Sequence, residues 1–88
     1  MTKKLDNLSI DYDSTTDVLC VFIGEPRSGT SIQDQEGVLI SKDATGKPVA
    51  VTVLNYDSQF RALPDVSWLA TRGLPSDLVD YLQARPAF

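Results

Sequence analysis

Apolar and polar residues in the first half of the chain alternate with the period of two that half-buried β-strands produce. Residues 8–12 show this alternation, and residues 18–23 resume an apolar, β-branched stretch after the Asp, Ser and Thr residues at 13–17. Those short polar side chains favour turns because they bond to nearby backbone groups. Residues 38–42 and 49–54 repeat the arrangement around a second group of turn formers. The pattern therefore predicts two β-hairpins.

The segment between the two hairpins is less regular. Residues 24–29 contain two glycines and a proline, which predicts a break in the sheet. Residues 30–36 contain one large apolar residue, Ile32, and are compatible with a loop or with an irregular start of the next strand. Gly37 would permit a β-bulge at that start.

The C-terminal third has the residue types and spacing of short helices. Asp65 is expected to cap a helix over residues 66–72, which Gly73 would close, and Ser76 is expected to cap a last helix that ends near residue 84. Both helices are too short to persist in water without packing against other parts of the chain. We therefore expect them to fold back onto the sheet.

A chain of 88 residues falls within the size of one domain. The predicted class is α+β, with a four-stranded antiparallel sheet of two β-hairpins and a short helical C-terminal segment packed on one face. A single domain is expected over residues 1–88, with the sheet core at 8–58 and the helical extension at 59–88.

Two of the predicted strands are apolar at nearly every position, which indicates that both of their faces are covered. The C-terminal segment has enough large apolar residues to cover one face. A second copy of the chain or another small protein would cover the other face, and we expect Val18, Cys20, Phe22 and Trp68 at that interface. Two alternatives remain open: the hairpins fold on each other as a small sandwich, or Trp68 packs onto the chain's own sheet.

The composition excludes several classes of chemistry. The chain has no histidine and one cysteine, so it cannot assemble a histidine-activated nucleophile, a zinc framework or an internal disulfide. We expect Cys20 to be a core residue and the protein not to be an enzyme. A formal net charge of −4 with scattered Lys and Arg argues against nucleic-acid binding. No segment has the length of a membrane span and no signal peptide is evident, so the expected location is the cytoplasm.

The acidic first turn is the main candidate for a ligand site. Asp11, Asp13 and Asp17 lie close together in the sequence, as the carboxylates of a calcium loop do. An EF-hand loop needs a glycine and a glutamate where this stretch has Thr16 and Phe22, so the stretch is more typical of a solvated turn. These three carboxylates are weak candidates for metal ligands, and no cofactor is expected.

Part of the sequence resembles a known family. Tyr12-Asp13 with Asp17-Val18-Leu19, Gly37-Val38-Leu39-Ile40, the turn residues Asp43 and Gly46, and the strand at 49–54 are similar to a family of small bacterial domains of unknown function. The resemblance implies a sheet of this kind and is nearly silent about chemistry. The sequence as a whole predicts a non-enzymatic, dimeric protein-interaction module; the alternative is a domain that binds a small molecule or a metal with the acidic turn.

Overall fold

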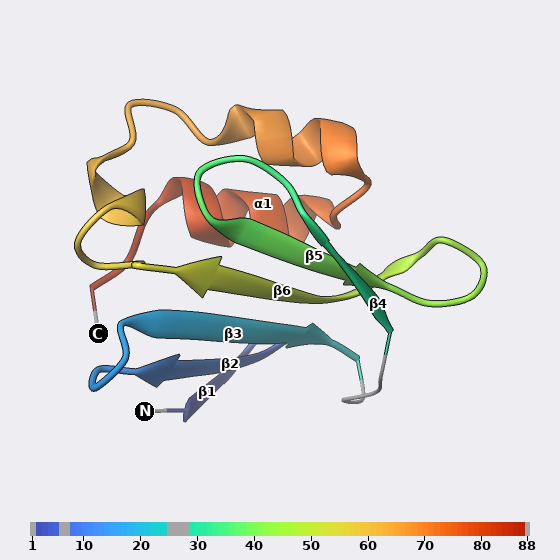
Figure 1. Cartoon of the computed structure of the whole chain (residues 1–88), viewed down its shortest axis with the longest axis horizontal. Helices are drawn as coiled ribbons and strands as arrows, with labels where there is room; N and C mark the ends of the chain where they lie inside the picture. Colours follow the sequence, from blue (N-terminus) through green and yellow to red (C-terminus); the bar gives the residue numbers. More distant parts are fainter. Residues whose placement is uncertain (1, 6–7, 25–28, 88) are drawn as a thin grey trace.

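The computed structural model describes the backbone of residues 2–5, 8–24 and 29–87, and the side chains of the last two ranges. Within these ranges the chain forms a six-stranded antiparallel sheet in the order β1-β2-β3-β6-β5-β4, and a helical segment lies above it in Figure 1. The strands are β1 (Thr2–Leu5), β2 (Leu8–Asp13), β3 (Val18–Ile23), β4 (Thr30–Gln33), β5 (Val38–Lys42) and β6 (Pro48–Leu54). The helices are η1 (Phe60–Ala62), η2 (Ser67–Arg72) and α1 (Ser76–Gln83). The α+β class is confirmed.

Both predicted hairpins are present, and they join through the two central strands. β2 pairs with β3 and β5 pairs with β6, while β3 and β6 lie side by side with Val21 opposite Val51. In the β5–β6 turn the Asp43 carboxylate accepts hydrogen bonds from the backbone N–H groups of Thr45 and Lys47, at 2.9 and 3.0 Å. Gly46 occupies this turn with φ of +85°, a conformation that costs a glycine nothing.

The prediction of four strands is wrong, because a further strand pairs with each hairpin. β1 pairs with β2, although the predicted sheet began only at residue 8, and β4 pairs with β5, where a loop and a strand were both open. The signal was weak for β4 because all four of its residues are exposed. Gly29 immediately precedes this strand, and a Cβ there would lie 2.6 Å from the Lys42 carbonyl oxygen. Residues 25–28 of the predicted break lie outside the described residues.

The helical segment differs from the prediction in its caps. The helix expected at 66–72 is the 3-10 helix η2, and the Asp65 carboxylate accepts hydrogen bonds from the N–H and hydroxyl groups of Ser67 at its start. The left-handed Gly73 ends it, as expected. The prediction that Ser76 caps the last helix is wrong: Ser76 is the first helical residue, and the preceding Pro75 makes no side-chain cap. The proline supplies a fixed φ at the helix entry instead.

One hydrophobic core lies between the sheet and the helical segment. Alternate residues of β2, β3, β6 and β5 point into it, and from the helical side the core receives large side chains that are fully buried. These helical-side residues are Phe60, Val66, Leu69, Leu78 and Leu82. The core therefore covers one face of the sheet, which we call the inner face.

Candidate interaction surface

The other face of the sheet, the outer face, has no helix over it in the described chain (Figure 1). The alternation along each strand places Val18, Cys20 and Phe22 of β3 on this face, where they are half-buried. β6 adds Ala50, Thr52 and Leu54, and β5 adds Leu39 and Ser41. The outer face is therefore an apolar surface over the central strands, interrupted by small hydroxyl groups.

Cross-strand register shows why this surface is partly open to solvent. Phe22 lies between Ser9 of β2 and Ala50 of β6, so its ring has small neighbours on both sides. Small neighbours leave more of an aromatic ring exposed than large ones do. Leu54, at the end of β6, keeps 36% of its surface exposed. The outer face therefore leaves part of its apolar surface in contact with water.

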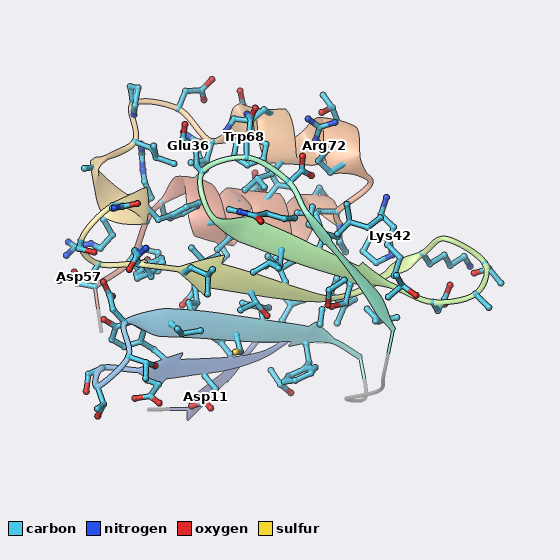
Figure 2. All side chains as sticks on the ribbon, in the orientation of Figure 1. Asp11, Glu36, Lys42, Asp57, Trp68 and Arg72 are labelled. Atoms are coloured by element: carbon cyan, nitrogen blue, oxygen red, sulfur yellow. The ribbon has the colours of Figure 1, made fainter. Side chains whose placement is uncertain are left out.

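The structure brings together three of the four predicted interface residues. Val18, Cys20 and Phe22 are successive outer-face residues of β3. Trp68 belongs to η2 and packs against the core on the inner side, so it does not share a surface with them. Figure 2 shows Trp68 in the helical layer and Asp11 at the opposite side of the molecule. The expectation that Cys20 is a core residue is wrong, since its half-buried thiol lies on the outer face.

The acidic first turn is held by Asp17, whose carboxylate accepts hydrogen bonds from one residue of β2 and from two residues that follow β6. One oxygen accepts from the Tyr12 hydroxyl at 2.7 Å and from the Asp57 N–H at 2.7 Å. The other accepts from the N–H and hydroxyl groups of Ser58, at 3.1 and 2.8 Å. The Asp17 carbonyl also accepts from the Tyr56 N–H at 3.0 Å. Asp17 thus ties the first hairpin to the segment that leaves the last strand.

These contacts shift two pKa values in opposite directions. The hydrogen bond from Tyr12, followed by that from the Asp57 N–H, stabilises the charged carboxylate and lowers the pKa of Asp17 to about 2. The same hydrogen bond, with some desolvation, raises the pKa of Tyr12 to about 12. Asp17 has a left-handed backbone with φ of +57°, which aspartate adopts more readily than most residues. The carboxylate is therefore ionised and engaged at neutral pH.

The three acidic residues considered as metal ligands do not form one cluster. Asp11 and Asp13 are exposed outer-side residues of β2, and the Asp13 carboxylate accepts a hydrogen bond from the Thr15 N–H at 2.9 Å. Asp17 directs its carboxylate toward Tyr12 and Ser58 instead. Among the described residues no group of three acidic, cysteine or histidine side chains is arranged to hold a metal ion.

The antiparallel sheet with one helical cover defines a small α+β domain, and the chain can be assigned to a family. Residues 9–56 match the model of a family described as "Protein of unknown function (DUF2283)". The match covers more than half of the chain, so the chain belongs to this family. Comparisons with curated proteins and with solved structures gave no significant match. In the described ranges no helix combines the length and apolar character needed to cross a bilayer.

Sequence reasoning missed two features of this region. The bonds from Asp17 to Asp57 and Ser58 join residues about forty positions apart, and no local pattern indicates such a link. The extent of the outer face was also missed, because Leu39 and Ala50 join it only through the strand order. The pairing of β3 with β6 is the information that was needed.

Proposed function

We propose that this protein is a non-enzymatic protein-interaction module and that the outer face is its binding surface. The observation that carries the proposal is the set of apolar side chains on the outer side of the central strands β3 and β6, which no helix of the described chain covers and most of which are partly exposed. Burying such side chains stabilises an association by about 25 cal/mol for each Å² of apolar surface removed from water. A face of this kind is suited to a flat protein surface more than to a small molecule, which needs a concave site.

The chemistry of the surface favours a partner that combines apolar and basic side chains. The centre of the outer face is apolar, and the exposed Asp13 lies at its border on β2. The whole chain carries a formal net charge of −4. A partner with lysine or arginine beside an apolar patch would match the apolar centre and the acidic border of this surface. The occupant that we propose is therefore another protein of that kind.

The test uses charged substitutions in the centre of the outer face and a matched charge elsewhere. Tagged wild type, Phe22→Asp, Thr52→Glu and the control Ala70→Asp would be expressed in the native host and recovered with bound proteins. Ala70 is exposed in η2, so its variant adds the same charge on the helical side. Melting temperatures would show that each variant is folded.

The expected result is that wild type and Ala70→Asp recover one protein that Phe22→Asp and Thr52→Glu lose. That protein, once purified, should bind wild type with a Kd in the micromolar range or tighter and bind the two outer-face variants at least tenfold more weakly. Equal recovery by all four proteins would overturn the proposal. A change in the mass of the isolated chain caused by Phe22→Asp would also overturn it, because the occupant would then be a second copy.

A further inference from the structure

The strand β4 is a short edge strand of the sheet that has few of the features that prevent pairing with another strand. It lies at the end of the strand order, in front of β5 in Figure 1. Its four residues, Thr-Ser-Ile-Gln, are all exposed and include no charge and no proline. Ile32 keeps 51% of its surface exposed. Edge strands normally carry charges, prolines or bulges that prevent the addition of another strand.

The hydrogen-bond pattern shows which backbone groups of β4 face the open edge. The Asp34 N–H donates to the Val38 carbonyl at 2.7 Å, at the point where the β4–β5 ladder meets its turn. Residue pairs in an antiparallel ladder alternate between bonded and non-bonded positions. Counting back from Asp34, the N–H and C=O groups of Ile32 and Thr30 point toward β5. Those of Ser31 and Gln33 therefore point outward, where a further strand would pair.

We propose that β4 pairs antiparallel with β4 of a second copy, with Ile32 opposite Ile32 of that copy. A two-fold axis between the two isoleucines sets Ser31 opposite Gln33 of the second copy, so the outward backbone groups of both residues bond across the axis. The isoleucines then occupy a non-hydrogen-bonded pair, in which Cα atoms lie about 4.5 Å apart and side chains are closest. This register buries the exposed Ile32. It also makes one continuous sheet in which the inner faces of the two copies lie on the same side.

Charge complementarity favours a second copy as the occupant. In this register Asp34 of the second copy lies opposite Thr30, and Thr30 pairs on its other side with Lys42. Asp34 already contacts Arg72 of its own chain, at 2.9 Å between the carboxylate and Nε. The dimer would bring Lys42 of one copy toward Asp34 of the other copy. The two-fold symmetry produces this approach twice. Opposite charges near a shared edge favour one register over others.

The proposal is separate from the partner proposed for the outer face. Ile32 pairs with the buried Ile40 and lies on the inner side, whereas Phe22 lies on the outer side. A dimer joined at β4 would place the two outer faces next to each other on one side of a continuous sheet. Substitutions at the edge and on the outer face therefore test different statements.

The first experiment measures the mass of the full chain by light scattering as a function of concentration. We expect wild type to approach twice the chain mass of 9.6 kDa at micromolar concentration, and Ile32→Lys to remain monomeric because it sets like charges opposite each other. Ser31→Pro, which removes an outward N–H, should also be monomeric. Leu54→Lys is the matched control, because Leu54 is an exposed apolar residue away from β4, and it should dimerise like wild type.

The second experiment tests the register by oxidation in a Cys20→Ser background. Ile32→Cys should form a disulfide-linked dimer, since the expected Cα separation is within the range that a disulfide spans. Ser31→Cys alone should form much less, because residue 31 is opposite residue 33. A monomeric wild type, a dimer that survives both Ile32→Lys and Ser31→Pro, or cross-linking that is no faster at residue 32 than at residue 31 would each overturn the proposal.

Discussion

The unequal cover of the two sheet faces predicts that the same substitution has very different costs on each side. Phe60 and Phe22 form a matched pair for this comparison. Phe60 is 0% exposed and stacks on Tyr56 with ring centroids 5.5 Å apart. Phe22 is half-buried on the outer face between Ser9 and Ala50. We expect truncation to alanine to destabilise the protein much more at Phe60.

The magnitudes follow from burial. Phe60→Ala removes a fully enclosed ring and leaves a cavity, which costs about 3–5 kcal/mol in the free energy of unfolding. Phe22→Ala removes a ring that is already partly in water and leaves no cavity, so we expect about 1 kcal/mol. A domain of 88 residues has a total stability of roughly 4–13 kcal/mol. Phe60→Ala therefore removes a large part of the total stability, while Phe22→Ala should leave the protein folded.

Urea denaturation followed by tryptophan fluorescence measures both values, since Trp68 packs against the core. If Phe60→Ala does not fold, Phe60→Leu and Phe22→Leu replace the pair, and the same order should hold with smaller losses. Equal costs at the two positions would refute the reasoning. That result would mean that the outer face is enclosed in the isolated protein.

Three further predictions follow from local contacts. The pKa of Asp17 is lowered in the folded state, so its ionised carboxylate contributes fully to stability at a pH above 3.8, its ordinary pKa, and this contribution is lost as the pH falls toward about 2. In Asp17→Asn, the melting temperature should therefore fall less steeply with pH over this range. Gly46→Ala should cost about 1 kcal/mol from backbone strain at φ of +85°, whereas Gly46→Asn should cost less, as measured by urea denaturation. Calcium, magnesium or manganese should leave the melting temperature unchanged, because the described carboxylates form no three-residue cluster, and a rise with any of these ions would contradict this.

The sequence was informative where a local pattern determines the structure. The alternation in β2, the Asp43 turn and the left-handed Gly73 all follow from residue types within a few positions. It was less informative for β4, where a strand formed from mostly polar residues has no buried side to produce alternation. The placement of Trp68 also depends on how η2 packs against the sheet, which no pattern within the helix indicates.

The candidate surface was predicted in part for the same reason. The apolar run at 18–23 indicated that both faces of β3 need cover, but it did not say which neighbours share each face. That information lies in the pairing of β3 with β6. The strands β4 and β5 lie between them in the sequence, so the paired residues are about thirty positions apart. The role of Asp17 depends in part on the same long-range pairing, because its donors Asp57 and Ser58 follow β6.

The family match ends at residue 56, and the residues that enclose the inner face begin at Phe60. The matched region alone would therefore be a sheet with water on both sides, and three or more strands need at least one apolar face enclosed to be stable. In this chain the layer that encloses the inner face is therefore supplied by residues that follow the matched region.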